Sequence, residues 1–315
     1  MSVSIAVDIG GTQMRAACFP PDGAVLKSLA RVSTSHPYLS PLERLYELVA
    51  SIWPEDKTVT SIGVAAPGPV DPYQGIIHAA PNIPGWIDLP LRALLEERFN
   101  VPVSLGNDAN LAALGEWMFG AGQGHHHLIY MTVSTGIGGG IIVDDRLLLG
   151  ARGLAAEIGH TSVMLDGPLC GCGQRGHLEA VASGPAIARW AEQEFTQGVQ
   201  SILPVGQPLM AKDVAAAAHE GDELAAAALA RAGTFIGQGL ANFLHIFNPS
   251  IVIVGGGVSR SGSLLLDPIK AAMQEHVISP HYLDNLALCT AALGDEVGLM
   301  GALALARLSS RAERL

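Results

Sequence analysis

The sequence carries little charge, and basic residues are the scarcer kind. Charged residues make up only 15% of the chain, and 18 Lys and Arg stand against 29 Asp and Glu, for a formal net charge of −11. An acidic protein repels the phosphates of nucleic acids and the headgroups of anionic lipids. We therefore expect no nucleic acid and no membrane as partner, although backbone N–H groups can still bind the phosphates of a nucleotide.

Long apolar runs and a leader-like N-terminus are also missing. No stretch approaches the ~18 apolar residues of a membrane span. The N-terminus has no basic flank and Asp8 interrupts its apolar run, so we expect no signal peptide. There are only four cysteines, and two of them lie one residue apart beside several histidines. This spacing suits a metal better than a disulfide framework, and we expect a cytoplasmic, reducing environment.

What is present is a large apolar content with a repeated pattern. A hydrophobic fraction of 49% over 315 residues excludes a disordered chain and predicts two domains or one large one. Each half opens on a strand, a glycine-bearing turn (residues 8–12 and 134–140) and a returning strand, which predicts a duplicated β-hairpin whose turns face each other across a cleft. We expect the main further strands at 24–32, 59–66, 101–105, 251–254 and 286–290, and helices at 39–53, 89–99, 108–119, 185–195, 211–219, 222–247 and 296–308.

The two glycine turns carry chemistry suited to phosphate. Glycine permits close approach of the backbone, and consecutive N–H groups form an anion-binding nest. In the first turn, Asp8 can reach a Mg²⁺ ion, Gly10 and Gly11 leave room for phosphate, and Thr12 offers a hydroxyl. Ser134-Thr135-Gly136 offers the same chemistry in the second half. Each turn alone is equally explained as a tight hairpin, but two matching turns favour phosphate binding.

A third glycine cluster, Gly255-Gly256-Gly257, follows a strand and precedes a helix. Such a strand-to-helix turn is where nucleotides bind in α/β folds. None of the three turns is a Walker loop. A dinucleotide-type G-x-G-x-x-G spacing occurs only at Gly171–Gly176, in an irregular segment with no strand before it, so we regard it as accidental. A nicotinamide dehydrogenase is therefore not favoured.

Asp108 follows a predicted strand and opens a predicted helix. One interpretation is a helix-capping aspartate. The other is a carboxylate that accepts the proton of a hydroxyl nucleophile during phosphoryl transfer. Asn107 beside it can hydrogen-bond hydroxyl groups of such a substrate.

Cysteines and histidines converge in the second half. Cys170 and Cys172 are followed by His177, and His160 lies upstream, which makes a complete tetrahedral ligand set for a structural Zn²⁺. The alternative is two reduced cysteines with two surface histidines. Glu157 and Glu179 bracket this segment and can accept hydrogen bonds from sugar hydroxyls, or be solvated surface acids. We interpret the histidine run 125–127 as a loop, because consecutive side chains cannot all point one way.

Taken in order, these motifs resemble the ROK family (repressors, open reading frames and kinases), in its glucokinase branch. The resemblance runs from Asp8 to about Leu308. It is carried by the turns above and by Ala66-Pro67-Gly68-Pro69-Val70-Asp71, Pro81-Asn82-Ile83-Pro84-Gly85-Trp86, Asn107-Asp108-Ala109-Asn110, Glu157-Ile158-Gly159-His160 and the cysteine loop ending at Glu179.

The resemblance implies an α/β fold of the actin/hexokinase type, with duplicated RNase H-like domains and a central cleft. We expect residues 1–107, with the C-terminal helix 296–315 packing back on them, as the first domain and 108–295 as the second. It implies ATP-dependent phosphorylation of a hexose 6-hydroxyl, a homodimer, and Asp108 as the base. Sugar would be bound by Gly68, Asn82, Asn107, Asp108, Glu157, His160 and Glu179, and ATP with Mg²⁺ by Asp8, Gly10, Gly11, Thr12, Thr135, Gly136, Gly255, Gly256 and Gly257.

The chain departs from the family pattern at one position. His177 stands where the family usually has a third cysteine, so the expected zinc ligands are His160, Cys170, Cys172 and His177. Glucose is the favoured substrate, with N-acetylmannosamine, N-acetylglucosamine, mannose and fructose as alternatives. A sugar-responsive repressor is not favoured, because the first predicted strand begins at residue 3 and leaves no room for a DNA-binding segment. An intact Asp108 argues against a non-catalytic sugar sensor.

Overall fold

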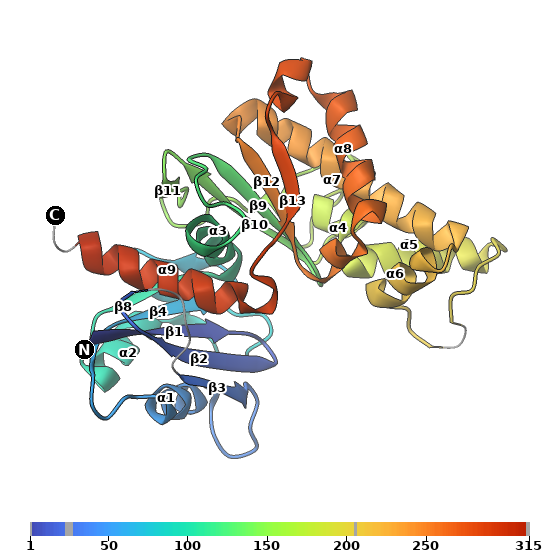
Figure 1. The fold of residues 1–315 in the computed structure, drawn as a ribbon. Helices are drawn as coiled ribbons and strands as arrows, with labels where there is room; N and C mark the ends of the chain where they lie inside the picture. Colours follow the sequence, from blue (N-terminus) through green and yellow to red (C-terminus); the bar gives the residue numbers. More distant parts are fainter. Residues whose placement is uncertain (1, 23–27, 205–206, 313–315) are drawn as a thin grey trace. The chain divides into compact units, whose positions relative to one another are not determined.

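The computed structural model describes residues 2–22, 28–204 and 207–312, which form two compact units (Figure 1). Unit 1 comprises Met1–Gly124, Leu147–Ala156 and Ala292–Leu315, and unit 2 comprises His125–Arg146 and Glu157–Ala291. The expected boundary between residues 107 and 108 falls inside unit 1. The chain passes between the units at 124/125, 146/147, 156/157 and 291/292.

Unit 1 is built on a five-stranded sheet with the order β3-β2-β1-β4-β8. β1 (Ser2–Ile9), β2 (Gln13–Phe19) and β3 (Ser28–Ser33) form an antiparallel meander, while β4 (Thr58–Ala66) and β8 (Val103–Asn107) run parallel to β1. The predicted strand at 24–32 is present from residue 28, and residues 24–27 lie outside the described part of the chain. Three parallel strands therefore end at one edge of this sheet.

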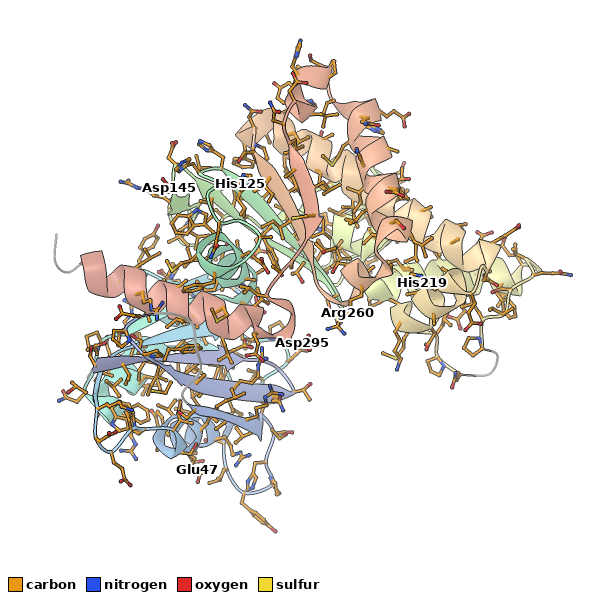
Figure 2. The ribbon with its side chains drawn as sticks, viewed as in Figure 1. Glu47, His125, Asp145, His219, Arg260 and Asp295 are labelled. Carbon is orange, nitrogen blue, oxygen red and sulfur yellow. The ribbon has the colours of Figure 1, made fainter. Side chains whose placement is uncertain are left out.

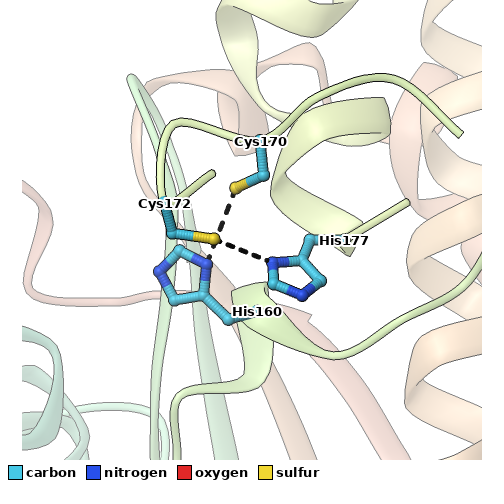
Figure 3. A group of neighbouring side chains, drawn as sticks. All are labelled: His160, Cys170, Cys172 and His177. Atoms are coloured by element: carbon cyan, nitrogen blue, oxygen red, sulfur yellow. Dashed lines mark hydrogen bonds between the residues drawn. The ribbon is translucent and has the colours of Figure 1, made fainter. Parts of the chain in front are cut away.

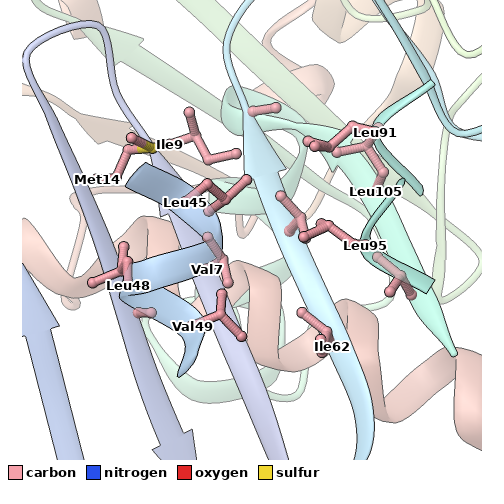
Figure 4. Close-up of a cluster of buried hydrophobic side chains, with 14 of the residues drawn as sticks. Val7, Ile9, Met14, Leu45, Leu48, Val49, Ile62, Leu91, Leu95 and Leu105 are labelled. Carbon is pink, nitrogen blue, oxygen red and sulfur yellow. The ribbon is translucent and has the colours of Figure 1, made fainter. Parts of the chain in front are cut away.

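Helices cover both faces of the sheet in unit 1. α1 (Pro41–Ser51) and α2 (Leu91–Phe99) bury Leu45, Leu48 and Leu95 against Val7 and Ile62 of the sheet (Figure 4). On the other face α9 (Val297–Ala312) packs on β1, β4 and β8, and α3 (Asp108–Phe119) packs on α9. Residues 313–315 of the expected last helix lie outside the described part.

Small residues let α9 approach its neighbours closely. A Cβ on Gly63 of β4 would lie 1.9 Å from the carbonyl oxygen of Ala302, and one on Gly301 would lie 2.0 Å from that of Leu111 in α3. Both distances are far below contact distance, so any side chain at either glycine would push α9 away.

A small sheet that we did not expect follows β4. It consists of β5 (Val70–Asp71), β6 (Ile76–Ala79) and β7 (Ile87–Leu89) in antiparallel order. Its strands have two to four residues, too few for period-two alternation to be visible in the sequence. The sheet ties the segment 68–71 to the segment 81–86.

Unit 2 repeats the strand order of unit 1, as β11-β10-β9-β12-β13. β9 (Leu128–Val133), β10 (Ile137–Val143) and β11 (Arg146–Leu147) correspond to the meander, and β12 (Ile251–Gly255) and β13 (Ala287–Thr290) run parallel to β9. The duplicated α/β fold of the actin/hexokinase type is thus confirmed. The predicted turn 134–140 is wrong in length, because Gly138, Gly139 and Gly140 pair with β9 as part of β10.

The helices of unit 2 are α4 (Leu178–Ala182), α5 (Gly184–Thr196), α6 (Ala211–His219), α7 (Glu223–Phe247) and α8 (Ser263–His276). α7 is the central one and packs against α4, α5, α6 and α8. Among the helices in the described ranges, none combines the length and the apolar character that crossing a membrane requires.

Candidate active site and metal centre

In unit 1 the candidate residues follow the ends of parallel strands. Asp8 of β1 lies opposite Ala65 of β4, and Ala66 lies opposite Asn107 of β8. The segments that follow, 10–12, 67–69 and 108–110, therefore emerge at one edge of the sheet. Ligands of open α/β sheets bind outside the carboxyl ends of the strands. Unit 1 thus brings Asp8, Gly68 and Asp108 to the same edge.

Asn107, not Asp108, caps α3. The Oδ1 atom of Asn107 accepts hydrogen bonds from the N–H groups of Ala109 and Asn110 at 3.0 and 3.1 Å, and its Nδ2 donates to the Gly68 carbonyl at 3.1 Å. Asp108 is the first residue of the helix and is exposed, and its Oδ1 accepts from the N–H of Ala109 at 2.8 Å.

The first glycine turn lies directly against the Pro81–Trp86 segment. A Cβ on Gly11 would be 2.5 Å from the Cβ of Asn82, so only glycine fits there. The turn itself is held by the N–H of Gly10, which donates to the Gln13 carbonyl at 2.9 Å, and by Thr34, whose hydroxyl donates to the Gly10 carbonyl at 2.7 Å. Asn82 and Thr12 are both exposed. A candidate sugar ligand and a candidate phosphate turn are thus neighbours within unit 1.

Sequence reasoning missed the partner of Asp8. Nε of Arg15 donates to the Asp8 carboxylate at 3.1 Å and Nη2 makes a shorter bond to the same oxygen, while Nη1 donates to the Asp295 carbonyl at 2.6 Å. On its other side, Asp8 abuts the start of α9, where a Cβ on Gly298 would lie 2.6 Å from the carboxyl carbon. Arg15 is seven residues away on the adjacent strand, and the alternation of β2 places it opposite Asp8.

In unit 2 the second and third glycine turns share an edge in the same way. Thr132 of β9 lies opposite Gly255 of β12, so the segments 134–136 and 255–257 leave the sheet side by side. The turn is closed by the N–H of Ser134, which donates to the Gly136 carbonyl at 2.9 Å. Gly256 has φ +82°, and a Cβ there would lie 2.3 Å from the Val133 carbonyl oxygen. Position 256 therefore requires glycine for both conformation and space.

The Glu157–His160 segment rests on the start of β10. A Cβ on Gly159 would lie 1.9 Å from the Ile137 carbonyl oxygen, so this segment and the second glycine turn are in direct contact. Glu157 is exposed, and His160 is half-buried at the end of a short 3-10 helix (Ile158–His160).

The four expected metal ligands converge (Figure 3). One ligand atom from each of His160, Cys170, Cys172 and His177 lies within 4.8 Å of all the others. The Nδ1 atom of His160 is 3.7 Å from the Cys170 sulfur, and the Nδ1 atom of His177 is 3.2 Å from the Cys172 sulfur. A tight turn places the cysteines, because the Gly173 N–H donates to the Cys170 carbonyl at 2.9 Å with φ +90° at Gly173.

This donor set fits zinc. Bonds of ~2.3 Å to sulfur and ~2.0 Å to nitrogen in a tetrahedron put the ligand atoms about 3.3–3.8 Å apart, close to the spacings of this group. Burial raises the pKa of the Cys170 thiol, and the adjacent Glu179 carboxylate raises it further. Binding a cation is the ordinary way for such a thiol to lose its proton. Because His160 turns Nδ1 toward the sulfur atoms, its Nε2 is left for another partner.

Glu179 links this metal group to the second glycine turn. It lies in the first turn of α4, two residues after His177, which is the N-cap of the helix. Its Oε1 atom is 3.6 Å from the Cys170 sulfur, and its Oε2 atom accepts a hydrogen bond from the N–H of Ile137 at 2.9 Å. A Cβ on Gly136 would meet Oε2 at 2.4 Å. Unit 2 therefore brings Glu179, the four candidate metal ligands and the second glycine turn together.

The histidine run at 125–127 is a loop, as expected. Nδ1 of His125 is 2.7 Å from the Ser250 hydroxyl, and Nδ1 of His126 is 2.8 Å from the Asp145 carboxylate. Figure 2 labels His125 and Asp145 in this part of unit 2. These contacts fasten the loop before β9 to its surroundings in unit 2. Among the described residues, the group that could hold a metal ion consists of His160, Cys170, Cys172 and His177 and includes none of these three histidines.

Known proteins resemble this chain over nearly its full length. The model of the ROK family matches residues 4–308. A glucokinase from Thermotoga maritima is 36% identical over 303 residues, which are 95% of each chain. A ROK family glucokinase from Streptomyces griseus, whose crystal structure is in complex with glucose and AMPPNP, is 38% identical with a TM-score of 0.81, covering 97% of this chain and 99% of that one. A xylose repressor from Caldicellulosiruptor bescii is 34% identical over 253 residues, 79% of this chain and 63% of the repressor. With these motifs, this sheet order and a match over nearly its full length, the chain belongs to the ROK family.

Proposed function

We propose that this protein is a glucokinase, which transfers the γ-phosphoryl group of ATP to the 6-hydroxyl of glucose. One observation carries the proposal: the first residue of α3 is an exposed aspartate, and the cap before it is tied to Gly68. The likeness to kinases that act on glucose supports it. An aspartate held in this way can accept a proton without a change in the backbone.

The proposed reaction uses Asp108 as the base. Its carboxylate accepts the proton of the 6-hydroxyl as that oxygen attacks the γ-phosphorus. The bond from the γ-phosphorus to the bridging oxygen of ADP breaks, and glucose 6-phosphate, ADP and a proton result. Asn82, Asn107 and the Gly68 backbone bind sugar from unit 1, and Glu157, His160 and Glu179 bind it from unit 2.

The glycine turns hold ATP in this proposal. Backbone N–H groups at Gly10, Gly11 and Gly136 and the hydroxyls of Thr12 and Thr135 bind phosphate oxygens. Gly255, Gly256 and Gly257 lie against the nucleoside. Mg²⁺, when bound, neutralises phosphate charge, and Asp8 is the residue that would hold it, directly or through water.

Zinc has a structural part in the proposal. His160, Cys170, Cys172 and His177 would hold it, and it would fix the loop that orients His160 and Glu179 toward sugar. None of the four cysteines forms a disulfide bond, which fits a reducing compartment, and we therefore place the protein in the cytoplasm. The family resemblance favours a homodimer, which sedimentation of the purified protein would test.

The first experiment measures ADP release from Mg-ATP with a panel of sugars. The panel contains glucose, mannose, fructose, N-acetylglucosamine and N-acetylmannosamine, and Asp108→Asn is run in parallel. We expect glucose to give the highest kcat/KM, and the variant to lose about 10²–10⁴-fold in kcat, the usual contribution of a general base.

Each other outcome changes the proposal in a defined way. Preference for another sugar would keep the kinase and replace its substrate. Full activity of Asp108→Asn would remove Asp108 as the base. No turnover of any sugar by zinc-replete protein would contradict the kinase itself.

A further inference from the structure

A fully buried glutamate, Glu116, lies two turns along the helix that begins with Asp108. Its exposed fraction is 0%, and the proposed reaction does not use it. An ionisable side chain is almost never fully buried unless its charge is compensated. The groups that donate hydrogen bonds to Glu116 therefore indicate why a carboxylate is buried here.

The carboxylate of Glu116 accepts three backbone N–H groups, one from the segment just after α3 and two from the segment before α9. Oε2 accepts from Ala121 at 2.8 Å and from Ala292 at 3.2 Å, and Oε1 accepts from Leu293 at 2.9 Å. The main-chain carbonyl of Glu116 also accepts from Gly120 and Gly122, at 3.0 and 2.9 Å. A single residue thus receives five N–H donors, two of which are 176 and 177 residues away in sequence.

The chain passes between the units four times, and the two segments lie in unit 1 beside the first and the last of these passages, which we call the outer crossings. The chain leaves unit 1 after Gly124, just beyond Ala121 and Gly122, and it returns at Ala292 after the last residue of unit 2. Both segments lack regular helix or strand structure at the bonded residues. Without Glu116, these N–H groups would lose the acceptor that holds the two segments against α3.

Gly120 shows how closely the crossing fits the carboxylate. A Cβ on Gly120 would lie 2.1 Å from Oε2 and 2.8 Å from the carboxyl carbon of Glu116. Its φ of −116° is open to any residue, and the closeness of the carboxylate is what leaves no space for a side chain. The chain therefore keeps room for this carboxylate at the end of α3.

We propose that Glu116 is a positioning residue that fastens both outer crossings to the helix carrying the base. The inference rests on the proposed function, because its catalytic effect requires Asp108 to act on a sugar. A carboxylate suits the role because it only accepts hydrogen bonds. It holds one N–H from each crossing on the same oxygen. A glutamine in its place would have an NH₂ group where Glu116 has its second oxygen, and this group cannot accept the backbone N–H groups.

The test compares Glu116→Gln with Glu96→Gln in the full-length chain. Glu96 is a matched control, because it is a half-buried glutamate of unit 1 whose Oε1 accepts one N–H, from Val103, away from either crossing. Hydrogen exchange is measured by mass spectrometry at residues 120–124 and 291–293. Steady-state kinetics with glucose follow, each variant being studied at the same interval below its own Tm.

We expect exchange at both segments to accelerate at least 10-fold together in Glu116→Gln, and kcat with glucose to fall at least 5-fold. In Glu96→Gln both quantities should match the wild type, although its Tm also falls. Gly120→Ala, which displaces the same carboxylate from outside, should reproduce the effect on both segments. If Glu116→Gln does not fold, Gly120→Ala provides the same test.

Unchanged protection of either segment in Glu116→Gln and Gly120→Ala would overturn the anchor. Faster exchange with an unchanged kcat would overturn its catalytic role. If the wild-type protein fails to phosphorylate glucose, the proposed function falls, while the exchange comparison alone still decides whether Glu116 fastens the crossings.

Discussion

Glu179 and Ile137 are joined by a hydrogen bond of 2.9 Å, from the backbone N–H of Ile137 to the carboxylate of Glu179. Ile137 is the first residue after the Ser134–Gly136 turn, and the other oxygen of Glu179 lies 3.6 Å from the Cys170 sulfur. One side chain therefore contacts both the proposed zinc loop and the proposed phosphate turn.

This double contact separates Glu179 from Glu157. Glu179→Gln should raise the KM for glucose and the KM for ATP together, each about 10-fold, because the amide can present a donor to the N–H of Ile137 and disturb the turn. Glu157→Gln should raise the KM for glucose alone, since Glu157 is an exposed residue before the 3-10 helix. Initial-rate measurements over both substrates would check this. An ATP response that is equal in the two variants would contradict it.

Arg15 should matter for ATP through Asp8. Their ion pair is largely sheltered, with side-chain exposures of 15% and 18%. We expect Arg15→Gln to raise the KM for Mg-ATP about 10-fold and to leave the KM for glucose near the wild-type value, because Asp8 loses the contact that fixes its carboxylate.

The control for that variant is Arg31→Gln. Arg31 pairs with Glu296 at 3.5 Å, and half of the Arg31 side chain is exposed. The same Glu296 carboxylate lies 3.8 Å from Arg15. Exposed ion pairs contribute ~0–1 kcal/mol, so this variant should behave as the wild type. If both arginine variants changed the KM for ATP equally, the effect would come from Glu296 and not from Asp8.

The metal centre predicts a dependence of sugar binding on zinc. Cys172→Ser should lower the zinc content from about one ion per chain and weaken glucose binding at least 10-fold, because the order of the loop and of the side chains that it orients depends on the ion. Cys289→Ser, the same substitution in β13, should keep both. Elemental analysis and titration calorimetry provide the two readouts. Zinc-free protein with full activity would refute the prediction.

His177→Cys makes the opposite change. It restores the third cysteine of the family pattern and adds a thiolate, so zinc should bind more tightly. Competition with a chelator would measure the difference. A lower zinc affinity would show that His177 ligates better in this loop than cysteine does.

The lowered pKa of Asp71 predicts that the fold loses stability in acid. The backbone N–H of Gln74 is the largest influence lowering its pKa, and the N–H of Tyr73 and the side chain of Gln74 lower it further, against an opposing effect of burial. A carboxyl group whose pKa is lower in the folded state stabilises the fold above its unfolded pKa of ~3.9, and this stabilisation is lost as pH falls through the folded value.

Asp71→Asn should therefore lower Tm at pH 7, and the gap to the wild type should narrow below about pH 4. Thermal unfolding followed by circular dichroism from pH 7 to pH 3 would check this. A gap of constant size over that range would mean that the substitution acts through the shape of the turn and not through the charge.

The sequence predicted most of what depends on local pattern. The long helices and strands were recognisable from apolar periodicity, and the metal group from the spacing of Cys170, Cys172 and His177. The short sheet β5–β7 was not, because strands of two to four residues show no period. Gly138–Gly140 were assigned to a turn because glycine usually interrupts strands, whereas here Gly139 lies where a Cβ would meet Ile158 at 2.2 Å.

The individual side-chain contacts between strands and between distant segments could not be predicted. Nothing near Glu116 in sequence indicates that Ala292 and Leu293 donate to it, and the pairing of Asp8 with Arg15 becomes visible only when β1 and β2 are in register. The roles of the individual site residues in binding sugar and ATP stay predictions.

The position of α9 also has a consequence for synthesis on the ribosome. Leu299, Ala302 and Leu303 of this helix are fully buried against strands that leave the ribosome first. All of unit 2 is translated before α9. The nascent chain must therefore carry an unfinished unit 1, with one apolar face of its sheet uncovered, while the whole of unit 2 is being made, and this interval is when the protein is most open to chaperones and to aggregation.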